Sequence, residues 1–225
     1  MAEMVLYLGN RNYSSWSLRA WLALEQSGLS FREEMIWFDQ DADRRQRLGI
    51  SPAGRVPVLV HGGLAIWDSL AIAEYLAELA PDAGLWPEER AARARARSLC
   101  AEMHSGFPAI RKDLPMNVRA HTAFRQRGSA VAKEIDRLTS MWTDTRREFG
   151  AGGDLLFGSR SLADTFYAPI AFRFRTYGIE THDEATAWLE ALLNLPPMRD
   201  WAMKAESEGH PAPAFDALLE GPSLS

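Results

Sequence analysis

Two adjacent serines, Ser14 and Ser15, stand between a predicted strand and a predicted helix. The apolar run at residues 5–8 predicts the strand, and apolar residues spaced three and four apart predict a helix that ends near Gly28. A polar N-cap at this junction directs hydroxyls and free backbone N–H groups toward one point, which suits an anion. Serine is also a favoured N-cap in helices without any function, so the pair has a structural interpretation as well.

The composition is that of an ordinary globular protein of one domain or two small ones. Of the 225 residues, 47% are hydrophobic and 24% are charged, and the formal net charge is −5. This mild acidity argues against nucleic acid as a partner, because no basic excess is present to neutralise phosphates. The arginines within residues 90–97 are interleaved with alanines and are interpreted as a solvated helix face.

Cysteine usage and hydrophobic patterning bear on the cellular compartment. Cys100 is the single cysteine, so no intrachain disulfide can form and a reducing compartment is expected. The N-terminus lacks the basic and apolar regions of a signal peptide. No apolar run approaches the roughly 20 residues that span a bilayer. We therefore expect a soluble, cytoplasmic protein that does not bind membranes.

The elements that must position the serines alternate between strand and helix signals. Residues 31–38 predict a second strand, and the charged residues 39–47 predict a loop or short helix. Residues 58–60 and 64–67 are rich in β-forming side chains and flank a Gly-Gly pair, which predicts a hairpin.

A helix is expected to start at Asp68 and to carry Ile72, Leu76 and Leu79 on one face. Together with the predicted strands it forms an α/β unit built on a small mixed sheet.

The second half of the chain has a different pattern. From residue 88 the signals are helical, so we expect an α/β domain at residues 1–80, a linker at 81–87 and an all-helical domain at 88–225. Residues 161–164, Ser-Leu-Ala-Asp, fit a capping box at the start of one of these helices.

Four segments, in this order, resemble motifs of the cytosolic glutathione transferase family, and the resemblance covers nearly the whole chain. Residues 14–19 resemble the serine-type active-site motif of the zeta class, and residues 51–59 resemble the family segment N-P-x-G-x-V-P, with Ser51 in place of asparagine. Residues 68–72 resemble the segment that binds the γ-glutamyl group, and residues 161–164 resemble the helical domain's capping signature. The chain is identified as a bacterial-type member of no assigned subclass.

The resemblance implies a thioredoxin-like first domain and glutathione as co-substrate, with the serines donating a hydrogen bond to its thiolate. A free thiol has a pKa near 8.5, and lowering it by about two units requires about 2.7 kcal/mol. A helix N-terminus supplies roughly 0.3–1 kcal/mol and a hydrogen bond to a charged group roughly 1.5–3 kcal/mol, so both are needed. Ser14 matches the family's catalytic serine and is preferred as the donor, and Ser15 is the alternative.

Five residues are expected to bind glutathione by the same resemblance. Val56 precedes a cis Pro57 and pairs with the cysteinyl backbone, whereas Ser69 and its helix N-terminus hold the γ-glutamyl carboxylate. Asp68 contacts the ammonium group, and Arg55 either pairs with a carboxylate or faces solvent. Taken alone, these residues also fit an ordinary strand start and a plain N-cap.

The pocket for the second substrate is expected at the helical half. Met103, His104, Phe107 and Arg111 are interpreted as one side of a helix and are candidates to line this pocket. Trp16, which replaces the cysteine of the zeta motif, is a further candidate. A single histidine on a helix is also consistent with a packed or exposed side chain. The histidines form no close ligand pair in the sequence, so no metal is expected, and neither a Gly-rich phosphate loop nor a G-x-S-x-G elbow occurs.

The function predicted from this resemblance is that of a glutathione S-transferase acting on a small, mostly apolar electrophile. The same resemblance implies a homodimer and a role in detoxification. The alternatives are a glutathione-dependent isomerase, a glutathione-disulfide reductase that uses two glutathione molecules, and a non-catalytic binding or regulatory protein.

Overall fold

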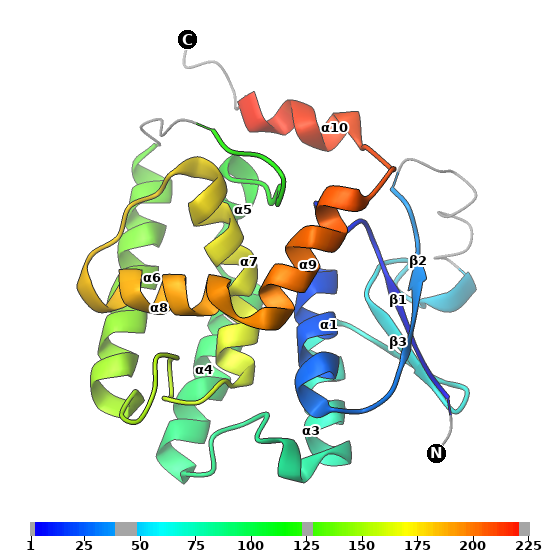
Figure 1. Ribbon diagram of the computed structural model, residues 1–225, viewed down its shortest axis with the longest axis horizontal. Coiled ribbons are helices and arrows are strands. Elements are labelled where there is room, and N and C mark those ends of the chain that lie inside the picture. Colours follow the sequence, from blue (N-terminus) through cyan, green and yellow to red (C-terminus); the bar gives the residue numbers. More distant parts are fainter. Residues whose placement is uncertain (1–2, 39–48, 123–127, 221–225) are drawn as a thin grey trace.

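A four-stranded mixed sheet forms one end of the molecule, and helices form the rest (Figure 1). The computed structural model describes residues 3–38, 49–122 and 128–220. The strand order is β2-β1-β3-β4, with β1 parallel to β2 and antiparallel to β3, and with β3 antiparallel to β4. The strands are β1 (Met4–Leu8), β2 (Arg32–Met35), β3 (Val58–His61) and β4 (Leu64–Trp67).

The helices lie in chain order around and beyond the sheet. They are α1 (Ser15–Ser27), α3 (Ser69–Leu79), η1 (Pro81–Ala83), α4 (Arg90–Ser105), α5 (Pro108–Asp113), α6 (Ser129–Phe149), α7 (Leu162–Tyr177), α8 (Asp183–Asn194), α9 (Pro196–Ser207), α10 (Pro213–Asp216) and η2 (Ala217–Glu220). The predicted fold class, a small mixed sheet with helices followed by helical structure, is confirmed. Across the described ranges, no helix combines the length and the apolar character that crossing a bilayer requires.

The first strand and the hairpin are confirmed, and the second strand is shorter than expected. Its predicted range of 31–38 contracts to β2, which lies at the edge of the sheet. The predicted loop or short helix at residues 39–47 lies outside the described residues. Gly62 and Gly63 both take positive φ in the hairpin turn, as the Gly-Gly pair predicts.

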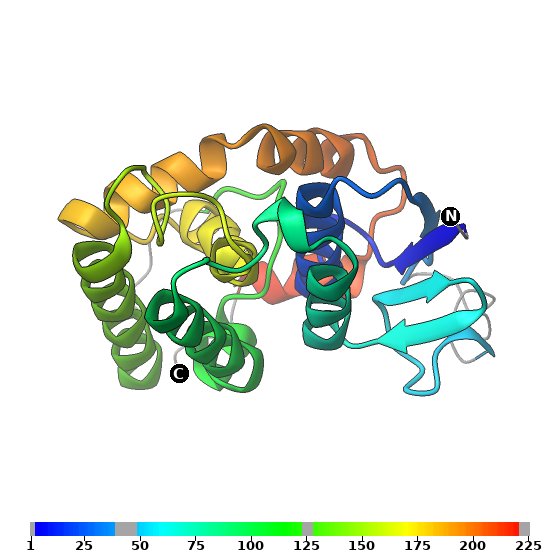
Figure 2. The same cartoon turned by 90° about the horizontal axis from the view of Figure 1, so that it is seen from below.

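Helix α1 lies between the sheet and the helical half of the molecule (Figure 2). It contacts α3 on the sheet side and α7 on the other side, and Leu18 and Leu22 are buried. Ser14 is its N-cap, and its side chain accepts a hydrogen bond from the Ser17 backbone N–H. Gly28 ends the helix in the left-handed conformation that glycine adopts without strain.

Helix α3 confirms the predicted start at Asp68 and corrects one predicted core residue. Ile72 and Leu76 are buried, but Leu79 is 39% exposed. It is exposed because α3 ends at Leu79 and the chain turns away into η1.

The capping box at the start of α7 is confirmed and has a wider structural role. The Asp164 carboxylate accepts hydrogen bonds from the backbone N–H of Leu156 at 3.0 Å and of Ser161 at 2.9 Å. It also accepts from the Ser161 hydroxyl at 3.1 Å and from the Trp188 indole N–H at 2.9 Å. Burial raises the pKa of Asp164, and these hydrogen bonds oppose that shift. One carboxylate therefore ties α7, α8 and the preceding loop together.

Replacing this carboxylate is expected to be strongly destabilising. Asp164→Ala leaves four donors without an acceptor in a fully buried site, so we expect a loss of at least about 3 kcal/mol in the free energy of unfolding. Chemical denaturation measures it, with Asp136→Ala, at an exposed aspartate, as a control that changes stability by less than about 0.5 kcal/mol. Equal effects of the two substitutions would contradict the assigned role.

Candidate functional site

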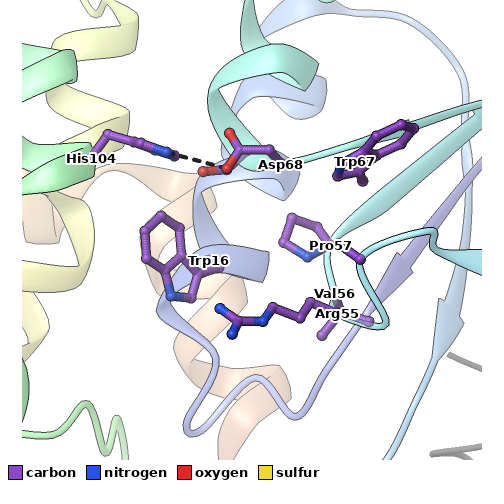
Figure 3. A pocket seen from close by; sticks show the side chains of 9 residues that line it. Trp16, Arg55, Val56, Pro57, Trp67, Asp68 and His104 are labelled. Carbon is purple, nitrogen blue, oxygen red and sulfur yellow. Dashed lines mark ion pairs between the residues drawn. The ribbon is translucent and has the colours of Figure 1, made fainter. Parts of the chain in front are cut away.

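A pocket opens where the ends of the sheet, α1 and α4 meet (Figure 3). We call it the Pro57 pocket. Its volume is about 260 Å³, and it is lined by Trp16, Ala53, Arg55, Val56, Pro57, Trp67, Asp68, Ser69 and His104. The five residues predicted to bind glutathione all line this pocket, and the Val56–Pro57 peptide bond is cis.

A second pocket lies beside it and is called the serine pocket. Its volume is about 450 Å³, and it is lined by Tyr13, Ser14, Ser15, Trp16, Phe38, Gly54, Arg55, Val56, Arg111, Pro115, Met116, Arg173, Phe215 and Leu218. Trp16, Arg55 and Val56 belong to both pockets. The two pockets therefore share a wall, and the serine pair lies on one side of it.

The hydroxyls of the serine pair are placed differently. The Ser14 hydroxyl donates to Ser17 Oγ at 2.7 Å, and Ser17 Oγ also accepts the Gly9 N–H at 3.0 Å. The Ser15 hydroxyl makes no hydrogen bond with any residue in the described part of the chain. Ser14 therefore belongs to a short hydrogen-bonded chain that starts at the backbone of Gly9, whereas Ser15 has an unused donor.

The start of α3 forms the far wall of the Pro57 pocket. Asp68 takes a positive φ of 76° as the N-cap, and its Oδ1 accepts the Leu70 N–H at 2.7 Å. Ser69 is 1% exposed, and its Oγ is buried without a hydrogen-bond partner among the described residues. An unpartnered buried hydroxyl at a helix N-terminus is suited to a carboxylate ligand.

His104 reaches the Pro57 pocket from α4. Its Nε2 lies 3.2 Å from Asp68 Oδ2, and its ring meets the Trp16 ring edge-on with centroids 5.2 Å apart (Figure 3). Burial lowers the pKa of His104, Arg19 and Arg111 lower it further, and Asp68 raises it. His104 therefore links the helical half to the N-cap of α3 as a neutral or weakly basic partner.

Trp16 lies between two guanidinium groups. The Arg19 Cζ is 4.7 Å and the Arg111 Cζ is 4.9 Å from the centre of its ring. Cation–π attraction favours this arrangement and holds the ring in place between the two pockets. Arg55 is an exposed residue that lines both pockets, and in Figure 3 its side chain extends from the Val56–Pro57 segment toward the side of Trp16.

The predicted helix face at residues 103–111 is corrected. Helix α4 ends at Ser105, and Phe107 takes a positive φ of 61° before α5 begins. This break turns the chain, so Met103 and Phe107 are buried in the core and line neither pocket. His104 and Arg111 do line the pockets, one in each.

Several lining residues had not been expected from the sequence. Arg173 lies on α7, and Phe215 and Leu218 come from the C-terminal segment, far from the serines in the chain. Tyr13 fixes that segment, because its hydroxyl donates to Asp216 and its ring stacks on Phe215. No local motif marks these positions, since only the tertiary fold brings them to the pocket. Within residues 3–38, 49–122 and 128–220, no cluster of three His, Cys, Asp or Glu side chains fits a metal ion.

A family model and individual relatives in sequence point to the same protein family. The family model "Glutathione S-transferase, N-terminal domain" matches residues 13–79. Glutathione S-transferase Z1 of Arabidopsis thaliana is 30% identical over 167 residues, which cover 69% of this chain and 71% of that protein. A probable maleylacetoacetate isomerase of Caenorhabditis elegans is 29% identical over 175 residues, covering 75% and 79%.

Solved structures share the fold. A glutathione transferase homologue from Burkholderia gl BGR1, solved with bound glutathione, superposes with a TM-score of 0.69 at 21% identity. The match covers 92% of this chain and all of that one. The sheet and α1 at one end, with helices beyond them, are therefore the thioredoxin-like and helical parts of a known architecture.

The half-buried position of His104 predicts that stability depends on pH. Its pKa in the folded state lies below 6.5, so the unfolded chain binds its proton first, and stability is lost as pH falls below that value. Thermal unfolding between about pH 7.5 and pH 5.5 tests this. Wild type should lose more stability over this range than His104→Gln, whereas His121→Gln, at an exposed histidine, should follow wild type. Parallel curves for wild type and His104→Gln would disprove the expectation.

Proposed function

Because the chain belongs to the glutathione S-transferase family, we propose that it binds glutathione and activates its thiol for attack on a small electrophile. The observation that carries this proposal is the shared wall of the two pockets. The unpartnered Ser69 hydroxyl lies on one side of the wall and the serine pair on the other. A ligand with a carboxylate at one end and a thiol further along fits this arrangement.

Glutathione is proposed to lie along the Pro57 pocket. Its γ-glutamyl carboxylate accepts hydrogen bonds from Ser69 and the first backbone N–H groups of α3, and its ammonium group pairs with Asp68. The backbone of Val56 pairs with the cysteinyl unit, and Arg55 pairs with a carboxylate. This position points the thiol toward the serine pocket.

Ser14 is proposed as the hydrogen-bond donor to the thiolate. The hydroxyl oxygens of Ser14 and Ser17 lie 2.7 Å apart. Because each hydroxyl can donate or accept, the donor and acceptor of this hydrogen bond can exchange roles without movement of either oxygen. Ser17 then donates to Ser14, and the Ser14 proton turns to the sulfur, while Ser17 Oγ still accepts from Gly9. A chain of hydrogen bonds polarises its members, which supports Ser14 as the stronger donor. The unpartnered Ser15 hydroxyl is the alternative.

The reaction that follows activation of the thiol has several candidates. The maleylacetoacetate isomerase similarity favours a glutathione-dependent isomerisation as a second candidate, alongside conjugation. Disulfide reduction would need two glutathione molecules, since Cys100 is fully buried and burial raises its pKa well above the ordinary value. A non-catalytic protein is the remaining alternative, and absence of turnover with every electrophile would favour it.

Assembly and location are also part of the proposal. Two apolar side chains of β4, Leu64 and Trp67, are exposed, which supports a homodimer. The free, buried Cys100 supports a reducing compartment such as the cytoplasm, and a role in detoxification is proposed from the family alone. We divide the chain into a glutathione-binding domain at residues 1–80, a linker at 81–87 and a helical domain at 88–225.

Substitution of each serine tests the thiolate assignment. Ser14→Ala should lower kcat/KM for a conjugation reaction by about 100-fold and raise the pKa of bound glutathione by about one unit or more, because a charge-assisted hydrogen bond is lost. Ser15→Ala should change kcat/KM by less than about 3-fold. Steady-state kinetics measure both, with Ser98→Ala on the exposed face of α4 as the control.

Two results would decide against this assignment. Loss of activity in Ser15→Ala alone would transfer the role to Ser15. Full activity in both variants would show that neither hydroxyl activates the thiol.

A further inference from the structure

The loop that leads from β1 to Ser14 contains a hydrogen-bonded turn at residues 10–13, which we call the serine turn. The Asn10 carbonyl accepts the Tyr13 N–H at 3.1 Å and the Ser14 N–H at 2.9 Å. In a turn of this kind, the N–H groups of the two central residues, here Arg11 and Asn12, have no acceptor inside the turn. Because the Ser14 N–H bonds to the turn, a shift of the turn moves Ser14.

Both of these central N–H groups donate to one carboxylate, that of Glu208. The Arg11 N–H donates to Oε1 at 2.7 Å, and the Asn12 N–H donates to Oε2 at 3.3 Å. Among the described residues, no other acceptor bonds to either group. Asn12 is fully buried, and Arg11 and Glu208 are 8% and 9% exposed. The carboxylate therefore satisfies two buried donors that would otherwise be unpaired.

Helix α9, which precedes Glu208, packs beside α1 and contacts the same turn (Figure 1). The Trp201 indole N–H donates to the Arg11 carbonyl at 3.0 Å, and Trp201 is fully buried. The Arg11 Nη1 lies 3.6 Å from Glu208 Oε1, and the Arg11 Cζ lies 5.7 Å from the centre of the Trp201 ring. The backbone and the side chain of Arg11 are thus both held by α9 and its C-cap.

The Glu208 carboxylate does not stabilise the helix that carries it. Glu208 is the C-cap of α9, where the negative end of the helix macrodipole disfavours a carboxylate. Burial raises the pKa of Glu208, whereas the N–H groups of Arg11 and Asn12 and the Arg11 charge oppose that shift. The favourable contacts of this carboxylate are therefore those with the serine turn.

We propose that Glu208 is a positioning residue for activation of the glutathione thiol, because it holds the serine turn and so fixes the point toward which the Ser14 hydroxyl donates. The inference rests on the proposed function and adds a residue that acts through Ser14. Glu208 lines neither the Pro57 pocket nor the serine pocket. Its effect on the thiol therefore passes through the turn.

Glu208→Gln tests the proposal, because it changes hydrogen bonding with little change in shape. The amide offers one acceptor oxygen, and its NH2 group faces the second N–H donor, so the turn loses a hydrogen bond. The pKa of bound glutathione, measured by ultraviolet absorbance of the thiolate, should rise by about half a unit or more. Binding of S-methylglutathione, which has no thiol to ionise, should change by less than about 3-fold by calorimetry.

Alkylation of glutathione by iodoacetamide gives a readout that a loss of folded protein would not reproduce. The thiolate attacks the methylene carbon, a C–S bond forms, and iodide leaves with the bonding pair. In Glu208→Gln, kcat should fall by about 3-fold near about pH 6 and recover near about pH 9, where the thiol is ionised in both proteins. A smaller folded fraction would lower kcat by the same factor at every pH, and that result would contradict the proposal.

A double variant shows whether Glu208 acts through Ser14. In the Ser14→Ala background, Glu208→Gln should shift the pKa of the bound thiol by less than about 0.2 units, because the donor is already absent. A shift of the same size in both backgrounds overturns the proposal. Glu206→Gln, at an exposed glutamate of α9, is the matched control and should change neither the thiol pKa nor kcat.

Glu208→Asp replaces Glu208→Gln if the latter does not fold. Its side chain is shorter by one methylene and cannot reach both N–H groups, so the thiol pKa should again rise. If Ser14→Ala raises the thiol pKa and the Glu208 variant leaves it unchanged, the inference is overturned and the proposed function stands. If the wild-type protein does not lower the pKa of bound glutathione, the proposed function fails, and the role of Glu208 fails with it.

Discussion

The burial of helix α1 between the sheet and α7 is the constraint on which the site depends. One side of α1 contacts α3, while on the other side Arg19 Nε donates to the Phe166 carbonyl of α7 at 3.1 Å. The helix start is held as well, because Ser17 Oγ accepts the Gly9 N–H and the Ser14 hydroxyl. A helix fixed along its length and at its start presents Ser14, Ser15 and Trp16 in one position.

That position creates both a binding site and a stability cost. Trp16 separates the two pockets because guanidinium groups hold its ring, yet those guanidiniums are partly or fully buried without carboxylate partners in the described structure. The buried carboxylate of Asp164 differs from these guanidinium groups, because it accepts four hydrogen bonds and stabilises the fold. Buried charge that remains unpaired is unfavourable for folding alone, and such unfavourable arrangements are typical of functional sites.

Local patterns in the sequence predicted most of the elements, and the family resemblance named the residues that line the Pro57 pocket. The distant part of the serine pocket's lining required the tertiary structure. The hairpin, the α3 N-cap and the capping box depend on residues within a few positions of one another, and all three were predicted. The break between α4 and α5 was missed because the positive φ of Phe107 has no sequence signal comparable to glycine. Arg173 was missed because it reaches the serine pocket only through the packing of α7 against α1.

The most direct test of the account is the ionisation of glutathione in its complex with the wild-type protein. Ultraviolet absorbance of the thiolate, followed as a function of pH, gives the pKa of the bound thiol. The account predicts a pKa at least about one unit below the 8.5 typical of a free thiol, because Ser14 and the α1 N-terminus favour the charged form. A bound thiol that titrates like free glutathione, or the absence of saturable binding, would contradict it.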